Sequence, residues 1–440
     1  MKKIVLFMLL LLNVNAFSQE KWFAEIELPD LGKFEFFTTK IAISDVDFVL
    51  KSASDRDKIF LGTLKAKFLR TLQKREYKES IVALEIIENS GKLHSLFGTF
   101  SLDSVIATEN YVKATVIFGD ESFGTFIARK IDGEQEKMNY YEFIFNNLQK
   151  ITERNIFNPN LVKTKNWTKF IGKMQAKIPL VDDDLDFMLL FFANAGNVGF
   201  SHFSLLKTDI DLERTLSENQ IEATEVNDSV ILLKFNTLSG RISEIDSVFN
   251  RYKHGKIFIL DFRKMPGGLL KNACETASML IKDTISGGNF ATRLCYESEN
   301  CISDDFYVLE NFDYESFTRI LQKEKGVKIR LSPNEKVHIP ELKKIYILVD
   351  SKTASAGEPL VLGLQKSGNA LVVGETTAGQ VLSPKIFDIG GGFYAAIPIA
   401  EYVTDTGERI EGKGVVPSVK IKSKKALEWV YNDLKIGNTQ

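Results

Sequence analysis

The second half of the chain alternates strand-like and helix-like segments. A buried β run at residues 256–261 precedes a helical pattern at 271–281, and a second β run at 345–349 precedes apolar residues at helical spacing, Leu360 and Leu364. Each helix in such a pattern carries the chain back over one face of a sheet, so consecutive strands run parallel. The alternation therefore predicts an α/β core with a largely parallel sheet.

A serine lies among small residues in the turn after the second β run. Ser355 occupies the third position of Thr-Ala-Ser-Ala-Gly-Glu, directly before the helical pattern. The free N–H groups at a helix start stabilise negative charge, so a serine nucleophile here would have an oxyanion site beside it. The same letters also form a capping box, with Ser355 as N-cap and Glu358 three residues later. Alone, this segment favours the cap.

A histidine lies in a small-residue loop that follows an apolar helical pattern. The loop reads Gly-Asn-Val-Gly-Phe-Ser-His-Phe and contains Ser201 and His202. A loop histidine can act as a general base, and a neighbouring hydroxyl can orient its ring. Taken by itself, this segment favours a structural histidine.

Two glycine-rich segments complete the candidate set. After the strand at 257–261 the chain reads Phe-Arg-Lys-Met-Pro-Gly-Gly, ending at Gly267 and Gly268. Glycines permit positive φ angles and close backbone approach, so their N–H groups can form part of an oxyanion hole; a tight turn is the alternative. We expect Asp261 and Arg263 to pair. Glu411 begins the glycine-rich segment that ends at Pro417. Its carboxylate is either a hydrogen-bond acceptor for a base or a surface charge.

Taken in order, these motifs resemble the S41 family of serine peptidases, which includes the C-terminal processing proteases and the tricorn core protease. The resemblance covers residues 180–425 and implies a ClpP/crotonase-like core of ββα units that needs no metal or cofactor. About twenty-five residues separate His202 from the strand at Val230, which leaves no room for the PDZ domain that processing proteases often insert. Phe262 and Lys264 depart from the small and polar residues common beside the Gly-Gly loop.

The residue that activates the serine differs between branches of this family. Processing proteases use a lysine twenty-five positions after the nucleophile, and here that position holds Gln380. The tricorn-like branch uses Ser-His-Glu with a serine before the histidine. The resemblance therefore implies Ser355 as nucleophile, His202 as base, Ser201 as supporting hydroxyl and Glu411 as orienting carboxylate. The implied oxyanion donors are the backbone N–H groups of Ala356 and of Gly267 or Gly268.

The rest of the chain divides by its periodicity. Residues 19–132 carry short β-branched runs separated by turns, which predicts an all-β sandwich or barrel-like domain. Residues 133–206 form a helical region that carries the Ser-His motif, and residues 207–440 form the peptidase core. The acidic run at 182–184 suggests either a metal site or, more simply, the first turn of a helix.

The first residues have the pattern of a signal peptide. Lys2 and Lys3 precede an apolar run at 4–12 and a small-x-small site ending at Ser18, so we expect residues 1–18 to direct export to a periplasm or the exterior. Neither this run nor a later stretch is long enough to span a bilayer. Removing the two lysines changes the net charge from −2 to −4, a near-neutral balance that argues against a nucleic-acid or anionic-membrane partner.

Cysteine spacing leaves two states open. Cys295 and Cys301 can close a small loop in an oxidising compartment, or remain free thiols. Their spacing does not resemble a zinc site.

These observations favour an exported serine endopeptidase that acts on a peptide or protein substrate through an acyl-enzyme. A non-catalytic peptide- or lipid-binding protein on the same core is the alternative, since the family's lysine is absent and the chain holds 33 phenylalanines. A weaker third hypothesis is a structural protein whose β domain docks to a cell-surface partner.

Overall fold

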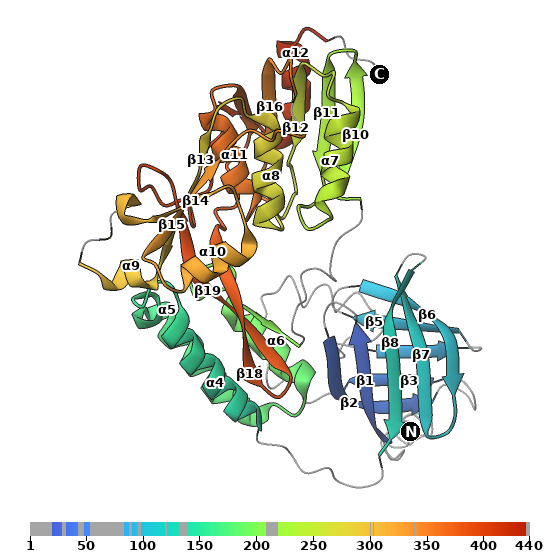
Figure 1. Cartoon of the computed structure of the whole chain (residues 1–440). Helices are drawn as coiled ribbons and strands as arrows, with labels where there is room; N and C mark the ends of the chain where they lie inside the picture. Colours follow the sequence, from blue (N-terminus) through green and yellow to red (C-terminus); the bar gives the residue numbers. More distant parts are fainter. Residues whose placement is uncertain are drawn as a thin grey trace, which may run out of the picture.

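A computed structural model of the chain describes residues 20–28, 32–42, 48–52, 83–87, 90–95, 98–118, 121–131, 140–207, 219–299, 301, 303–337 and 339–436. The expected signal peptide lies outside these residues. Within them, a barrel, a group of helices and an α/β core follow one another along the chain (Figure 1).

Eight antiparallel strands close into the amino-terminal barrel, because β1 pairs with both β2 and β8. Alternate residues such as Trp22, Ala24, Phe36 and Phe126 point inward and are buried, as the period of two requires. The predicted all-β domain is therefore confirmed as a barrel. Its strands are β1 Lys21–Leu28, β2 Gly32–Ala42, β3 Phe48–Ser52, β4 Ala83–Ile87, β5 Ser90–Ser95, β6 Gly98–Ala107, β7 Tyr111–Phe118 and β8 Glu121–Lys130.

The helical region shares its hydrophobic core with a hairpin from the last third of the chain. Helix α4 (Tyr140–Asn155) packs on strands β18 (Leu382–Gly390) and β19 (Phe393–Val403), and helices α5 (Lys165–Lys177) and α6 (Asp184–Ala195) belong to the same hydrophobic cluster. The shared core is rich in buried aromatic rings, each of which contributes about 1.5–3 kcal/mol on burial. Its buried phenylalanines are Phe145, Phe157, Phe170, Phe187, Phe191 and Phe393. The helices are thereby fixed to the core that follows them.

The α/β core is built on a six-stranded sheet in the order β10-β11-β12-β16-β17-β20. Every neighbouring pair is parallel except β10 and β11, as the alternation predicts. Helices α7, α8 and α11 cover one face and α12 covers the other. The elements are β10 Ile221–Asn227, β11 Val230–Phe235, α7 Ile242–Arg251, β12 Ile257–Asp261, α8 Leu270–Leu280, β16 Lys344–Val349, α11 Gly357–Lys366, β17 Ala370–Gly374, β20 Val419–Lys420 and α12 Ala426–Asp433.

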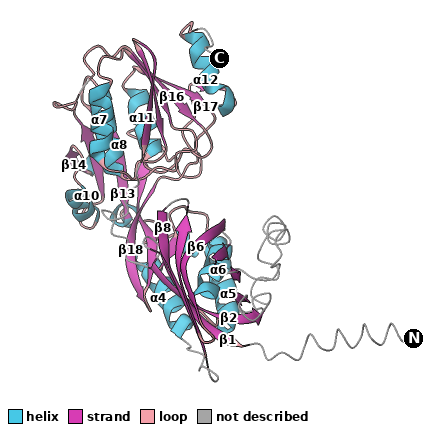
Figure 2. Ribbon diagram, turned by 90° about the vertical axis from the view of Figure 1, so that its right-hand side faces the viewer, coloured by secondary structure: helices cyan, strands magenta, loops and turns pink. Residues whose placement is uncertain are grey.

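A second sheet joins this core to the helical region. Its order is β14-β15-β13-β19-β18, and β9 (Ser204–Leu206) also pairs with β19. The remaining strands are β13 Ile285–Thr292, β14 Tyr307–Glu310 and β15 Gly326–Leu331, with helices α9 Arg293–Glu297 and α10 Tyr314–Leu321 beside them. Because β19 is eleven residues long, one strand reaches both the core and the helices (Figure 1), and Figure 2 shows its partner β18 at the same junction.

The acidic run at the start of α6 docks the barrel onto the helices. Asp183 is the N-cap of α6 and also accepts a hydrogen bond from the backbone N–H of Phe37 on β2. The buried Asp184 accepts hydrogen bonds from the N–H of Glu35 at 3.1 Å and the Tyr141 hydroxyl at 2.9 Å, and pairs with Lys207 at 3.0 Å. The interpretation of this run as the first turn of a helix is confirmed. Its Asp183 and Asp184 carboxylates bind protein donors on β2, Tyr141 and Lys207.

Cys295 and Cys301 form a disulfide with their Cα atoms 4.9 Å apart, while Cys274 is a buried free thiol. No helix among the described residues is long and apolar enough to cross a membrane.

Candidate active site

Ser355 lies in the tight turn between β16 and α11. Its φ of 53° places it in the left-handed region, where a non-glycine residue is strained. The turn is held because the N–H of Ala354 donates to Met265 O and the N–H of Ser355 donates to Gln380 O. The N-cap of α11 is Ala356, with no side-chain cap, so the capping-box interpretation of Ser355 is wrong. The Ser355 hydroxyl instead lies 3.0 Å from Nε2 of His202.

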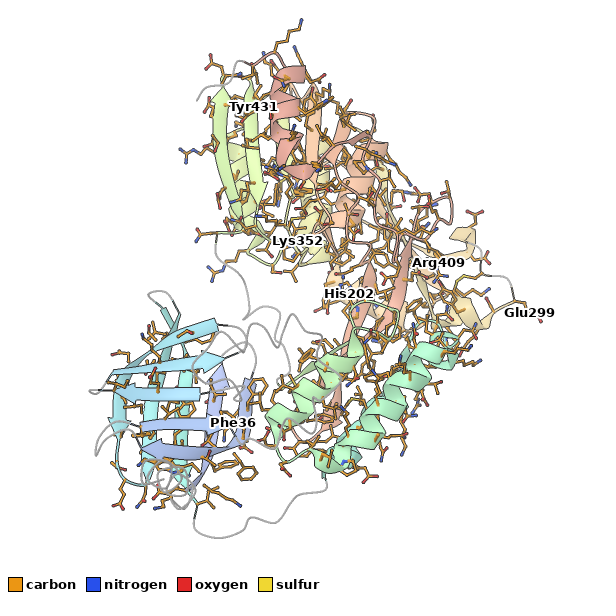
Figure 3. All side chains as sticks on the ribbon, turned by 180° about the vertical axis from the view of Figure 1, so that it is seen from behind. Phe36, His202, Glu299, Lys352, Arg409 and Tyr431 are labelled. Carbon is orange, nitrogen blue, oxygen red and sulfur yellow. A yellow bond between two sulfur atoms is a disulfide. The ribbon has the colours of Figure 1, made fainter. Side chains whose placement is uncertain are left out.

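His202 enters the site from the loop between α6 and β9. Its φ is 56°, and β9 anchors the residues after it by pairing with Tyr394–Ala396 of β19. Nδ1 of the ring lies 2.8 Å from the Ser201 hydroxyl, and burial lowers the pKa of the imidazole. Figure 3 shows His202 and Arg409 where the core meets the helices. A ring held at both nitrogens in this way has a fixed orientation toward Ser355.

Glu411 completes a chain of hydrogen bonds, but it contacts Ser201 rather than the imidazole. Its carboxylate accepts hydrogen bonds from the Ser201 backbone N–H at 2.9 Å, the Ser201 hydroxyl at 3.1 Å and the N–H of Val381 at 2.8 Å. Burial raises the pKa of Glu411 despite these donors. The expectation that Glu411 itself holds the ring therefore needs correction, because the Ser201 hydroxyl stands between the two groups.

Gly267 lies against the serine. Its φ is 96°, and a Cβ atom added to it would meet Ser355 Cβ at 2.6 Å and the backbone nitrogen of Ala356 at 3.1 Å. A Cβ atom on Gly268 would instead meet Leu238, so Gly267 is the glycine that faces Ser355. Within the described part of the chain, no protein group accepts a hydrogen bond from the N–H of Gly267 or of Ala356. Two neighbouring donors are thus available beside the hydroxyl.

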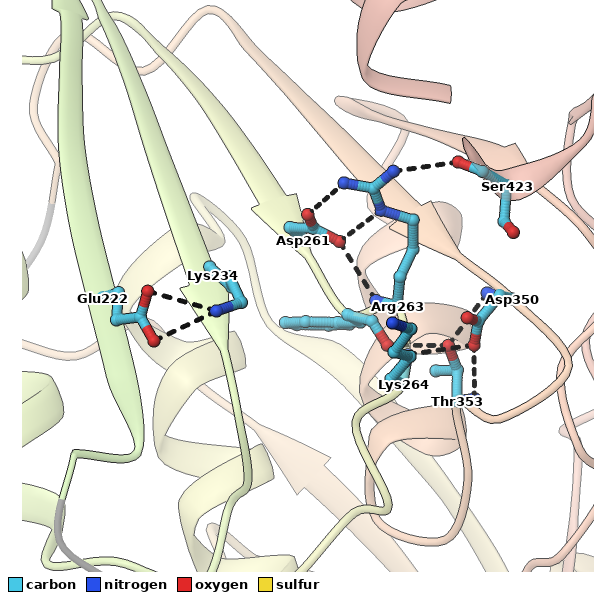
Figure 4. Close-up of polar contacts among 9 residues, drawn as sticks. Glu222, Lys234, Asp261, Arg263, Lys264, Asp350, Thr353 and Ser423 are labelled. Atoms are coloured by element: carbon cyan, nitrogen blue, oxygen red, sulfur yellow. Dashed lines mark hydrogen bonds and ion pairs between the residues drawn. The ribbon is translucent and has the colours of Figure 1, made fainter. Parts of the chain in front are cut away.

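Polar contacts fix the two loops that meet at this point (Figure 4). The Asp350 carboxylate accepts hydrogen bonds from the N–H of Lys264 at 3.0 Å and of Lys352 at 2.9 Å, and so joins the Gly-Gly loop to the Ser355 turn. Asp261 accepts from Nε of Arg263 at 2.8 Å, which confirms the expected pair, and Arg263 also donates to Ser423 O. These bonds hold the glycine loop in register with the serine.

Glu358 is a structural member of the site that the sequence interpretation missed. It is fully buried and accepts hydrogen bonds from the Thr377 hydroxyl at 2.6 Å and from the N–H groups of Gly379 and Gln380 at 2.7 and 2.8 Å. This carboxylate therefore positions the carbonyl of Gln380 that receives the Ser355 N–H. The signal was present as the glutamate three residues after Ser355, but it was assigned to a cap.

The site can remove a proton from a serine hydroxyl and offer two backbone donors to a developing oxyanion. Among the residues that the structure describes, no three histidine, cysteine, aspartate or glutamate side chains gather as metal ligands would.

Comparison with known proteins gives the family. Residues 230–421 match the model of peptidase family S41. The core of this chain belongs to peptidase family S41. Among curated members, the carboxy-terminal processing protease CtpA of Bacillus subtilis is 26% identical over 231 residues, which cover 52% of this chain and 41% of that protein. The carboxyl-terminal-processing protease of Picosynechococcus is 28% identical over 160 residues, 36% of this chain and 30% of that protein. The match thus spans less than half the length of either family member.

Two solved structures match this chain at low sequence identity. A lipoprotein from Streptococcus agalactiae superposes with a TM-score of 0.48 at 17% identity, over 69% of this chain and 99% of that chain. The tricorn protease superposes with a TM-score of 0.44 at 12% identity, over 91% of this chain and 46% of that chain.

Proposed function

We propose that this chain is an exported serine endopeptidase of the S41 family that uses Ser355, His202, Ser201 and Glu411 in a tricorn-like arrangement. The observation that carries the proposal is the unbroken series of hydrogen bonds from the Ser355 hydroxyl to the Glu411 carboxylate. The family match supports a serine peptidase, and Gln380 at the position of the family's lysine leaves the histidine as the base.

The hydrogen bonds select one tautomer of His202. An ionised Glu411 only accepts hydrogen bonds, so the Ser201 hydroxyl must donate its proton to that carboxylate. The hydroxyl oxygen then accepts a hydrogen bond from the N–H at Nδ1 of the ring, so the proton of the neutral imidazole is on Nδ1. Nε2 is left unprotonated and faces the Ser355 hydroxyl, which is the state a general base requires.

The reaction follows from this state. Ser355 Oγ attacks the peptide carbonyl while its proton passes to Nε2 of His202, and the ring later gives that proton to the leaving amine. The charge on the imidazolium is stabilised through Ser201 by Glu411. The N–H groups of Gly267 and Ala356 receive the oxyanion, and the loss of one such donor costs on the order of 10²–10³ in rate. In the second half of the reaction His202 takes a proton from water, the water oxygen attacks the acyl carbon, and the bond to Ser355 Oγ breaks as the imidazolium returns the proton to Oγ.

Export is the second part of the proposal. The signal-like residues 1–18 support it, and so does the disulfide Cys295–Cys301, because disulfides persist in oxidising compartments. The substrate is then a peptide or an unfolded protein segment outside the cytosol.

Turnover of an unfolded protein tests the proposal. Reduced, alkylated ribonuclease is incubated with the chain lacking residues 1–18, and new peptide termini are identified by mass spectrometry. We expect cleavage that survives a chelator and disappears in Ser355→Ala. Cleavage that a chelator abolishes contradicts the mechanism, and tight peptide binding without turnover, unchanged in Ser355→Ala, favours the non-catalytic alternative.

A further inference from the structure

A second buried carboxylate lies behind Glu411. Glu401, on β19, has no exposed side-chain surface, and its backbone is in register with Leu382, the neighbour of Val381. The N–H of Val381 donates to Glu411, so the two carboxylates belong to the same small region of the fold. Two carboxylates this near each other disfavour one another's ionised form. Burial is the main cause that raises the pKa of Glu411, and the proximity of Glu401 adds to it.

Arg409 forms an ion pair with Glu401 and interacts electrostatically with Glu411. Its Nε donates to Glu401 at 2.8 Å, and it lies two residues before Glu411 on a segment that pairs with β19 through Val403. Both carboxylates act electrostatically on Arg409 and raise its pKa. The Arg409 side chain is 49% exposed, so its charge can be removed without opening the core.

Tyr296 fixes the other oxygen of Glu401. Its hydroxyl donates to Oε2 of Glu401, and its ring lies 5.9 Å from the Arg409 guanidinium. Tyr296 belongs to α9, next to Cys295 of the disulfide loop, and its ring also packs edge-on against Phe157. Glu401 therefore has one orientation, and Arg409 is held beside it.

We propose that Arg409, held in place by Glu401 and Tyr296, is a positioning residue that keeps Glu411 ionised and so sets the tautomer of His202. This inference rests on the proposed function. A protonated Glu411 would donate to Ser201, the Ser201 hydroxyl would donate to Nδ1, and Nε2 would carry the proton. That tautomer cannot accept a proton from Ser355. The charge on Arg409 thus controls which nitrogen faces the nucleophile.

Several charged and titratable groups lie around Glu411 in the described part of the chain. His202 faces it through Ser201, Glu401 and Tyr296 lie behind it, and Arg409 and the exposed Lys413 flank it on its own segment. Removal of the Arg409 charge should favour protonated Glu411, whereas neutralising Glu401 should favour its ionised form. The two changes are therefore expected to act in opposite directions, which a general loss of structure does not produce.

The test measures the rate of Ser355 modification by a fluorophosphonate from pH 4.5 to 8.5 at low ionic strength. We expect Arg409→Gln to move the acid limb of this profile upward by about half to one pH unit and Glu401→Gln to move it downward. Arg409→Lys, which keeps the charge, should restore most of the wild-type profile. Urea unfolding of each variant shows that the compared proteins are folded.

Two results overturn the inference in different ways. The first is that the two variants shift the profile in the same direction, or not at all, while labelling of the wild type still depends on His202. This result rejects the role of Arg409 and leaves the proposed function intact. Absence of Ser355 labelling in the wild type at every pH rejects the proposed function itself, and the inference with it.

Discussion

The Ser201 hydroxyl donates a hydrogen bond to the Glu411 carboxylate over 3.1 Å, and the same hydroxyl lies 2.8 Å from His202. A serine thus occupies the place at which an acid could touch the imidazole directly. Its hydroxyl can both donate and accept, so it transmits the ionisation state of Glu411 to the ring without bearing charge.

Removal of this hydroxyl should separate the acid from the base. In Ser201→Ala the ring loses its partner on Nδ1, and both tautomers become accessible. We expect the rate of fluorophosphonate labelling to fall on the order of 10²–10⁴-fold with little loss of stability. Ser204→Ala, three residues away on β9, is the matched control and should label normally. Equal rates for Ser201→Ala and wild type would show that Glu411 plays no part through this residue.

The close approach of Gly267 to the serine predicts a sharp effect of one methyl group. In Gly267→Ala the new Cβ would lie 2.6 Å from Ser355 Cβ at a φ of 96°, so the loop or the serine must move. We expect labelling to fall on the order of 10²–10³-fold and stability to fall by about 1–3 kcal/mol. Urea unfolding with parallel labelling measures both.

Gly363 provides the control for that substitution. It lies inside α11, and a Cβ there would be 3.5 Å from Ile285, an ordinary contact. Gly363→Ala should therefore stabilise the protein by about 0.5–1 kcal/mol through helix propensity and leave labelling unchanged. If Gly267→Ala and Gly363→Ala change labelling and stability alike, crowding between residue 267 and Ser355 is not the cause of the loss of labelling.

Asp184 should be the most sensitive point of the junction between barrel and helices. Its side chain is 1% exposed and its partner Lys207 is 10% exposed, so Asp184→Asn leaves a buried lysine without its anion. We expect a loss of about 3–5 kcal/mol in unfolding free energy, partly recovered when Lys207→Met is added. The exposed Asp182→Asn should change stability by less than about 0.5 kcal/mol. A double variant as unstable as the sum of the single variants would argue against a buried pair.

The buried state of His202 gives a pH dependence with a defined sign. Burial holds its pKa below the ordinary value of 6.5, so the base stays neutral, and labelling stays fast, to pH values somewhat below 6.5. In that window the unfolded chain binds a proton that the folded chain does not, so the wild type loses stability as pH falls. His202→Gln lacks this loss. Its free energy of unfolding in urea, relative to that of the wild type, should therefore increase as the pH falls from 7.5 to 5.5. A constant difference would place the pKa of His202 at its unfolded value.

The periodic parts of the fold could be predicted from sequence because their burial is one-sided. Strands β12 and β16 and helices α8 and α11 follow the predicted segments closely. Helix α5 lies inside the region predicted to be helical, but its position was not predicted, because its apolar residues Trp167, Phe170, Ile171 and Met174 are interrupted by lysines and a glycine. Its burial depends on aromatic rings from α4, from α6 and from the loop that holds His202, which local periodicity does not report.

The site shows the same division between local and distant information. Ser355, His202, Ser201 and Glu411 were found as motifs, and the structure brings them together. The roles of Glu401, Tyr296 and Glu358 could not be predicted, because each depends on contacts between residues distant in sequence or on burial. Glu411 was expected to accept a hydrogen bond from the imidazole of His202, but it accepts from Ser201. The order of groups along a hydrogen-bonded chain depends on how the side chains pack.

The central claim is that His202 activates Ser355. It is tested most directly by treating the protein with a fluorophosphonate under native conditions and identifying the modified peptide by mass spectrometry, with Ser355→Ala and His202→Ala in parallel. We expect a single adduct on Ser355 that is absent from Ser355→Ala and reduced on the order of 10²–10⁴-fold in His202→Ala. Labelling at Ser355 that proceeds equally fast in His202→Ala would contradict it.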